Sequence, residues 1–314
     1  MRKIIAARFP APKFRPISLE PYRCVSGEAL EKDLSKELSD YVQAVNYDKL
    51  TYLTQFLALC GQMRGFAIFN RMESSGQRGI DTYGGSDCVG QAIDLSNQLR
   101  QKNYPAVVAA QKADHEFRYT HAAVVINFKA DDQKQGCILL DPGNNFVKAH
   151  LLYPNIDTEF KHMENTLNYL FLPDQETIRV TLRQPQKPAD VSIFLLREAI
   201  GADQFISNPN VVLMKGHPVS SRDQEGNVVA SINPMFGTKQ IKFRYKKEEL
   251  YVSFADFKNK TVPPGKLRDA IFNEDLSGFT EEFEGSFGPK AKVWNRLNQA
   301  IENEETMKDL YSAY

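Results

Sequence analysis

The chain has 314 residues, of which 42% are hydrophobic and 25% are charged, a composition typical of folded globular proteins. Basic and acidic residues number 39 each, so the formal net charge is zero, which gives no support to nucleic-acid binding and argues against disorder driven by net charge. No run of about 18 apolar residues occurs, so we expect no membrane-spanning helix.

The N-terminal segment is basic but lacks the pattern of a secretory signal. Its short apolar run is interrupted by Arg8 and stopped by Pro10, whereas a signal peptide needs an apolar run of about 7–15 residues. We therefore interpret residues 1–23 as an extended arm of a cytoplasmic protein. A short transit peptide is the alternative, because the first 16 residues contain five basic side chains and no acidic one.

The sequence from residue 27 to about residue 72 has a helical pattern. Its second part is strongly apolar and predicts a buried helix, broken near Gly61, that places Cys60 in the core. In its first part, apolar residues recur at i, i+4 spacing and define one stripe that would face a core. The members of that stripe are Leu30, Leu34, Leu38 and Val42.

The next stretch, residues 73–87, is rich in glycine and serine and predicts a loop that leads to Cys88. An amphipathic helix is expected to begin at Cys88, with Ser86 or Asp87 as its N-cap, and to end near Lys102. The residues predicted to face inward are Val89, Ala92, Ile93, Leu95, Ser96 and Leu99.

Short segments rich in β-branched residues follow this helix and predict an antiparallel meander. From about residue 256 the chain is predicted to be helical and polar. Residues 217–226 are expected to connect two strands. The predicted strands are residues 106–111, 121–128, 136–141, 177–184, 189–199, 210–216, 227–234 and 239–254.

These elements predict an α+β fold with four parts. A helical N-terminal domain would cover residues 1–86, and residues 87–190 would hold the helix of Cys88 and a central antiparallel β domain. Residues 191–278 would form a third, β-rich domain, and residues 279–314 a helical C-terminal tail.

The cysteines and histidines give no metal signal. The four cysteines have no CxxC spacing, so neither a zinc site nor a redox pair is predicted, and free thiols in a reducing compartment are expected. His150 and His162 lie near several acidic residues but lack a ligand spacing such as HExxH, so we expect no metal there.

Cys88 is the candidate nucleophile of the chain. A thiol attacks as the thiolate, and the backbone N–H groups at a helix start favour negative charge and can bind an oxyanion. We expect the N–H of Cys88 to take part in that oxyanion site. Gly84 and Gly85, just before it, would allow the backbone to approach the site closely.

Such a thiol also needs a base and a group that orients the base. His121 begins one predicted strand, and Asp141 ends the next one before a Pro-Gly turn. If these strands pair as an antiparallel hairpin, His121 and Asp141 lie near its open end, although the pattern leaves open which face each side chain takes. Each residue alone has a structural explanation, but the three in this order are much less expected by accident.

The residues around this set resemble the transglutaminase-like cysteine superfamily. There the cysteine begins a helix of the form C-x-x-x-A-x-x-L-x-x-x-L-R that ends before Pro-Ala. The residues that match this form are Cys88, Ala92, Leu95, Leu99, Arg100, Pro105 and Ala106.

Within the superfamily, the chain is most similar to the arylamine N-acetyltransferases, over roughly residues 30–275. The resemblance rests on the helical region before Cys88, the Gly-Gly pair, the stretch "LLDPGNNF" and the later strands. Two features depart from the family pattern Arg-Gly-Gly-x-Cys: Tyr83 stands in place of the arginine, and one extra residue separates Gly85 from Cys88.

The resemblance implies an N-acyltransferase in which Cys88 accepts the acyl group, His121 is its base and Asp141 orients the imidazole. It implies a small-molecule acyl donor, acyl-coenzyme A or a thioester on an acyl carrier protein, and an amine acceptor that becomes an amide. It implies no permanently bound cofactor. The alternatives are a hydrolase or transpeptidase that uses the same three residues, and a non-catalytic binding module.

Overall fold

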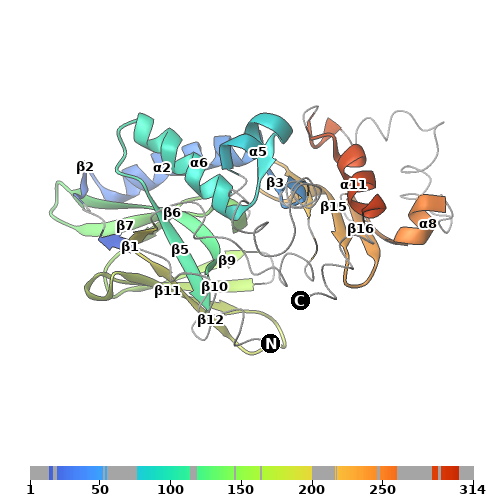
Figure 1. The fold of residues 1–314 in the computed structure, drawn as a ribbon. Coiled ribbons are helices and arrows are strands. Elements are labelled where there is room, and N and C mark those ends of the chain that lie inside the picture. Colours follow the sequence, from blue (N-terminus) through green and yellow to red (C-terminus); the bar gives the residue numbers. More distant parts are fainter. Residues whose placement is uncertain are drawn as a thin grey trace.

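The computed structural model describes residues 14–16, 20–51, 54, 76–113, 119–144, 146–162, 165–199, 216, 218–245, 248–259, 285–288 and 291–303. Several sequence predictions lie outside this part of the chain: Cys60, the strand at 210–215 and the helical stretch at 260–284. In the described part, two mainly antiparallel sheets carry helices on their outer sides, an α+β arrangement (Figure 1). No helix in these ranges is long and apolar enough to cross a membrane.

The first long helix is α2, Gly27–Ala44, and Ser26 caps its N-terminus by accepting a hydrogen bond from the N–H of Ala29 at 3.1 Å. The predicted stripe is confirmed, because all four of its residues are buried along this helix. The chain then forms a strand, β3 (Asn46–Asp48), where the sequence pattern predicted more helix. Tertiary pairing accounts for the difference, since β3 is hydrogen-bonded to a strand on each side.

The expected loop at 73–87 is wrong in its central part, because α5 spans Gly76–Tyr83. Gly84 ends this helix with a φ of 70° and donates its N–H to the carbonyl of Ile80 at 2.9 Å. The short strand β4, Gly85–Ser86, follows. Glycine and serine content indicated a loop, but Ile80 packs against the hydrophobic core and supports the helix.

The predicted helix at Cys88 is confirmed as α6, Cys88–Gln101. Asp87 is its N-cap, and its carboxylate accepts the N–H of Gly90 at 2.8 Å. Five of the six residues predicted to face inward are buried, and Ile93 is half-buried at the edge of the core.

The larger sheet has nine strands in the order β8-β7-β6-β5-β12-β11-β10-β9, with β2 beside β6. All pairs are antiparallel except β2 with β6. A bridge between Pro154 and Phe171 brings the two ends of the sheet together, so the sheet curls into a barrel-like form. The strands are β2 (Tyr22–Cys24), β5 (Val107–Ala113), β6 (Tyr119–Ala130), β7 (Gln135–Leu140), β8 (His150–Leu152), β9 (Asp157–His162), β10 (Asn165–Leu172), β11 (Thr177–Arg183) and β12 (Asp190–Leu195).

The predicted meander is confirmed at its centre by β5, β6 and β7, and β11 and β12 also match their predictions. The sequence pattern missed β8, β9 and β10, which lie between residues 150 and 172. A separate pair joins β1 (Phe14–Pro16) to β13 (Arg197–Ala199), so part of the predicted N-terminal arm is extended.

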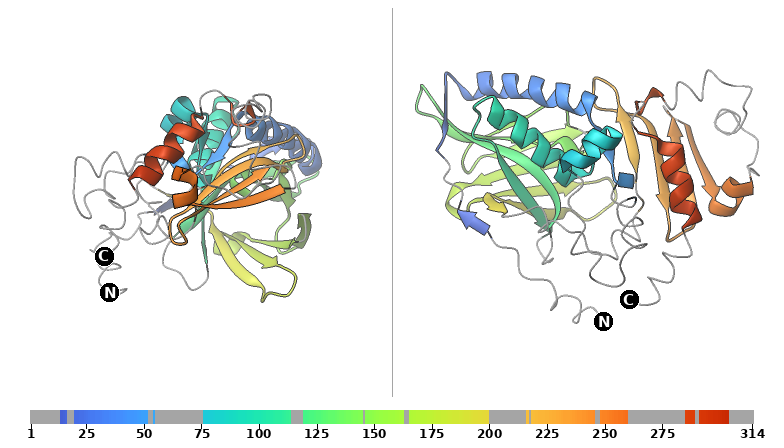
Figure 2. Two further views of the ribbon diagram at one scale, coloured as in Figure 1. Left: turned by 90° about the vertical axis from the view of Figure 1, so that its right-hand side faces the viewer. Right: turned by 45° about the horizontal axis from the view of Figure 1, so that its top comes forward.

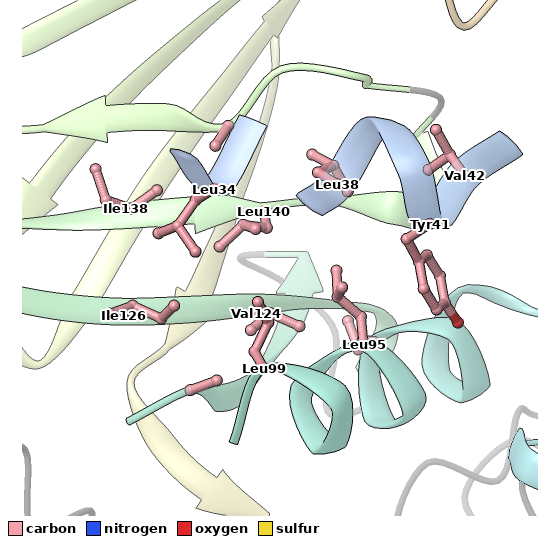
Figure 3. Close-up of a cluster of buried hydrophobic side chains, with 14 of the residues drawn as sticks. Leu34, Leu38, Tyr41, Val42, Leu95, Leu99, Val124, Ile126, Ile138 and Leu140 are labelled. Carbon is pink, nitrogen blue, oxygen red and sulfur yellow. The ribbon is translucent and has the colours of Figure 1, made fainter. Parts of the chain in front are cut away.

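Side chains of the meander alternate between two cores, as expected for strands buried on both faces. Val124 and Ile126 of β6 and Leu140 of β7 face α2 and α6, which lie across this side of the sheet (Figure 3). Their neighbours Val125 and Leu139 face the inside of the curled sheet. The helix of Cys88 is therefore fixed against the outer face of the meander.

The smaller sheet has six strands in the order β17-β16-β15-β14-β3-β4, so two strands that precede Cys88 complete a sheet from the second half of the chain. The predicted connection at 217–226 contains a strand, β14, because Val219 is buried between β3 and β15. The predicted strand at 239–254 is a hairpin. The strands are β14 (Val219–Arg222), β15 (Val228–Met235), β16 (Gln240–Tyr245) and β17 (Glu248–Ser253).

Two described helices follow this sheet, in line with the predicted helical C-terminal part. They are α8 (Phe254–Asn259) and α11 (Val293–Glu302), and α11 lies along the strands β15 and β16 (Figures 1 and 2). The domain boundaries inferred from the sequence stay a prediction. The sharing of β3 and β4 ties the segment before Cys88 to the C-terminal half of the molecule.

Candidate functional site

Cys88 is the first residue of α6 and is buried, with 6% of its surface exposed. Its position follows from the two short elements before it, because β4 pairs in parallel with β3 and Asp87 caps the helix. The first N–H groups of a helix lack acceptors within the helix and carry partial positive charge. The thiol of Cys88 thus lies where a negative charge is favoured.

His121 and Asp141 are brought together by the register of β6 and β7. Val124 pairs with Leu140, so Asp141, one residue beyond β7, lies diagonally across from His121 on the same face. Nε2 of His121 lies 2.9 Å from each carboxylate oxygen of Asp141. The structure therefore supplies what the sequence left open, namely that both side chains take the same face.

Asp141 is fully buried, and its hydrogen bonds with Asn144 lock the turn that follows it. Its Oδ1 accepts the backbone N–H of Asn144 at 3.1 Å, and its Oδ2 accepts the side-chain amide of Asn144 at 2.8 Å. Sequence reasoning treated the Asp-Pro-Gly-Asn stretch as a turn and missed the contribution of Asn144. An aspartate followed three residues later by asparagine was the available signal, because such residues bond to nearby backbone in turns.

Gly143, in the same turn, lies directly against Cys88 and His121. A Cβ placed on Gly143 would lie 2.5 Å from Cβ of Cys88 and 2.7 Å from Cε1 of His121. Real Cβ atoms do not approach other atoms this closely, so only glycine fits here without a shift. This contact shows that the thiol-bearing helix start and the imidazole meet at one point.

The pKa of His121 reflects its two partners. Burial lowers the pKa, but the negative charges of Asp141 and Cys88 and hydrogen bonds to both raise it, and the net result lies well above the usual value of 6.5. Because Nε2 is engaged by Asp141, Nδ1 is the ring nitrogen left for the thiol. The three predicted residues therefore form one connected set.

The glycine pair before Cys88 serves the backbone packing. The N–H of Gly84 is bonded to Ile80, so it is not a free donor for an oxyanion. Gly85 lies so close to β3 that an added Cβ would be 2.8 Å from both the carbonyl oxygen of Asn46 and Cβ of Asp48. The close approach of Gly85 is therefore toward β3, whereas the sequence predicted one toward the site.

A buried ion pair that the sequence did not indicate holds β3 to the C-terminal helix α11. Nη1 and Nη2 of Arg296 donate to the two carboxylate oxygens of Asp48 at 2.8 and 2.9 Å, and Nη2 also donates to Thr51 at 3.0 Å. The guanidinium lies over the ring of Tyr83, with Cζ 4.1 Å from the ring centroid. The C-terminal helix thus places an arginine beside Tyr83, which stands where the resembling family has an arginine.

Arg222 and Tyr47 also lie beside this set, and sequence reasoning missed both. Arg222 donates from Nη1 to the carbonyl of Pro142 at 2.9 Å, in the turn that follows Asp141. Burial raises the pKa of Tyr47 well above 10, and the charges of Cys88 and other acidic neighbours add to this. Tyr47 is therefore neutral at ordinary pH.

Among the described residues, Cys24, Cys137 and His150 do not join the site. Cys24 and Cys137 are free thiols. Burial raises the pKa of Cys137, so this thiol stays protonated and is a poor nucleophile. His150 is buried among aromatic rings, with the ring centroid of Phe160 4.0 Å away. Within the described ranges, no group of three His, Cys, Asp or Glu side chains is arranged to hold a metal ion.

Comparison with known proteins finds similarity at the level of the fold. No protein-family model matches the sequence, and no curated protein matches it. An arylamine N-acetyltransferase from Mycobacterium marinum, solved with CoA, is 11% identical with a TM-score of 0.49 over 88% of this chain and 93% of that one. The corresponding enzyme from Salmonella typhimurium is 11% identical with a TM-score of 0.45, over 92% of this chain and 99% of that one.

An arylamine N-acetyltransferase from Bacillus cereus, described as having a Cys-His-Glu catalytic triad, is also similar in structure. It is 11% identical, with a TM-score of 0.46 over 75% of this chain and 89% of that one. The chain thus resembles arylamine N-acetyltransferase structures in its fold. At such identities and TM-scores the likeness carries no conclusion about activity, so the function is inferred from the site itself.

Proposed function

We propose that this protein is an acyltransferase that carries the acyl group on Cys88 and passes it to an amine. The observation that carries the proposal is the connected set Cys88, His121 and Asp141, with Gly143 in contact with both the cysteine and the histidine. Each member supplies what the thiol needs: a helix start that favours the thiolate, a base beside it and a carboxylate that orients the base.

In the first half-reaction, the thiolate of Cys88 attacks the carbonyl carbon of an acyl thioester. The tetrahedral oxyanion would be stabilised by backbone N–H groups at the start of α6, among them that of Cys88. The bond to the donor sulfur then breaks, and His121 gives its proton to the departing thiol. The products are an acyl-cysteine and a free thiol, such as coenzyme A or a carrier thiol.

In the second half-reaction, an amine attacks the carbonyl carbon of the acyl-cysteine. His121, now neutral, accepts the proton that the amine loses, and the sulfur of Cys88 leaves as the thiolate. The products are an amide and the starting enzyme. Asp141 keeps the imidazole oriented throughout. A hydrolase with the same residues would differ only in the acceptor, which would be water.

The partition of an isolated acyl-enzyme tests this proposal. Protein acylated on Cys88 is freed of donor and mixed with an arylamine or an alkylamine at several concentrations, and amide and free acid are quantified. An acyltransferase gives amide that rises with amine concentration at the expense of acid. If acid is the product at every amine concentration, the protein is a hydrolase. A Cys88 that no thioester acylates and iodoacetamide does not alkylate would favour the binding module.

A further inference from the structure

Arg222 ends β14 at a break in the strand register. Ser221 pairs with Ala230, whereas Arg222 pairs with Val228, so one residue of β15 is skipped between them. Such irregularities re-aim side chains and are frequent beside functional sites. Here the guanidinium reaches the turn after Asp141, where its Nη1 donates to the carbonyl of Pro142 at 2.9 Å.

The other edge of the guanidinium has no acceptor among the described residues. Nε and Nη2 of Arg222 are both buried, and no described residue accepts a hydrogen bond from either. These two nitrogens share one side of the planar group, where their N–H bonds are parallel and match the two oxygens of a carboxylate. The hydrogen bond from Nη1 to Pro142 fixes the plane of the group, so the open edge has a defined direction.

The charge of Arg222 is also left without a partner in the described ranges. Burial lowers its pKa to about 10, against the raising effect of Tyr47, Asp141 and Tyr41, so the group is still a cation at neutral pH. The oxygens of Asp141 are taken by His121 and Asn144. The ring of Tyr47, 5.8 Å from Cζ of Arg222, is neutral and contributes only its face. Burying an unmatched cation with two open donors is costly unless an anion can bind there.

This open edge lies close to the reacting thiol. Arg222 is bonded to Pro142, and the next residue, Gly143, is in contact with Cys88, which places the guanidinium within about 10 Å of the thiol. That span matches a chain of a few carbon atoms. It is shorter than an extended pantetheine arm, which separates a thioester from its phosphate by about 15 Å or more.

We propose that the Nε and Nη2 edge of Arg222 binds a carboxylate of the substrate, so that the enzyme selects a substrate with a carboxylate a few bonds from its reacting group. This inference rests on the acyl transfer proposed above and names the substrate class of the same site. The carboxylate has two possible sources, the acyl chain of the donor and the amine acceptor, and each belongs to a different half-reaction.

The donor arm measures acylation of Cys88 by thioesters of N-acetylcysteamine, which carry no phosphate. Glutaryl thioester is compared with its neutral methyl ester, in wild type and in Arg222→Gln, which removes the charge and the paired donors but keeps a polar side chain. Wild type should be acylated about 10-fold or more faster by the anionic thioester than by the neutral ester, and the variant should lose this preference. The rate of acylation by the neutral ester should change by less than about twofold. Arg222→Lys, which keeps the charge but not the fork, should retain only part of the preference.

The acceptor arm measures deacylation of the acetyl-enzyme by 4-aminobenzoate and by neutral 4-aminobenzamide. If wild type prefers the carboxylate substrate in either arm, and Arg222→Gln abolishes that preference, the inference is supported and the source of the carboxylate is identified. Equal loss for charged and neutral substrates would make Arg222 a structural anchor of the Pro142 turn and overturn it. The inference would also be overturned if wild type showed no preference for the carboxylate in either arm. It would be overturned too if Arg222→Gln reacted more slowly with acetyl-coenzyme A but not with acetyl-N-acetylcysteamine. Failure of every thioester to acylate wild type would instead overturn the proposed function.

Discussion

Nε2 of His121 lies 2.9 Å from both carboxylate oxygens of Asp141, a relationship set by the pairing of β6 with β7. The same turn that carries Asp141 also places Gly143 against Cys88 and the carbonyl of Pro142 against Arg222. A short segment of chain therefore orients the base, shapes the space around the thiol and fixes the guanidinium.

Asp141→Asn should slow acylation of Cys88 by about 100-fold or more. The amide removes the charge that raises the pKa of His121, and it does not hold the ring in the orientation that a carboxylate fixes. Single-turnover kinetics with an acyl thioester, recorded from pH 6 to 10, would measure the effect. Asp132→Asn, which changes an exposed carboxylate at the closed end of the β6–β7 hairpin, is the control and should react like wild type. Normal kinetics in Asp141→Asn would mean that this carboxylate has no part in catalysis.

His121 should make the stability of the fold depend on pH. Folding raises its pKa above the usual 6.5, so the protonated ring stabilises the native state fully below about pH 6.5. This contribution is lost as the pH rises through the folded-state pKa. The free energy of unfolding in urea, compared between wild type and His121→Asn, should differ most near pH 6 and less toward pH 10. A difference that grows with pH would contradict the assigned direction of the pKa shift.

Gly143→Ala should reduce acylation strongly while leaving most of the fold intact. The added methyl group would lie 2.5 Å from Cβ of Cys88 and must push the thiol and the imidazole apart, at a cost to stability of about 1–3 kcal/mol. Gly285→Ala is the matched control, because a Cβ there meets nothing within 4 Å. Iodoacetamide alkylation of Cys88 and thermal unfolding report the two effects. If both variants react alike, Gly143 does not shape the site.

The ion pair between Asp48 and Arg296 should contribute to stability only as a pair. Asp48→Asn leaves a buried arginine without its partner and should lower the free energy of unfolding by about 3–5 kcal/mol. Glu249→Gln, which breaks a half-exposed pair with Lys242, should cost less than about 1 kcal/mol. Urea denaturation measures both.

A double variant, Asp48→Asn with Arg296→Gln, provides the internal check on this pair. Since the two side chains are in direct contact, the double variant should lose clearly less stability than the sum of the two single variants. Strict additivity would show that the contact carries no coupling energy.

The site core was predictable because its signals are local. Cys88 follows a glycine pair and begins an amphipathic helix, and His121 and Asp141 stand at the ends of two strands whose alternation is visible in the sequence. A hairpin brings the ends of neighbouring strands together, so the order of residues was enough to group the three. The face of each side chain needed the register, which the sequence did not contain.

The surroundings of the site were not predictable because they depend on contacts between distant segments. Arg296 is 248 positions from Asp48, and Arg222 is 80 positions from Pro142. Strand β3 was missed for the same reason, since it is held by β14 and β4 and not by its own pattern. Helix α5 was predicted to be a loop because its glycines outweigh the weak apolar signal of Ile80.

The most direct test of the account is the intact mass of the protein after incubation with acyl thioesters. Acetyl, butyryl and glutaryl thioesters are supplied to wild type and to Cys88→Ala, and the modified peptide is located by fragmentation. Wild type should gain the mass of one acyl group, located on Cys88, and the variant should show no such gain. An adduct that persists in Cys88→Ala, or no adduct from any thioester on a folded protein with an alkylatable Cys88, would contradict the proposed function.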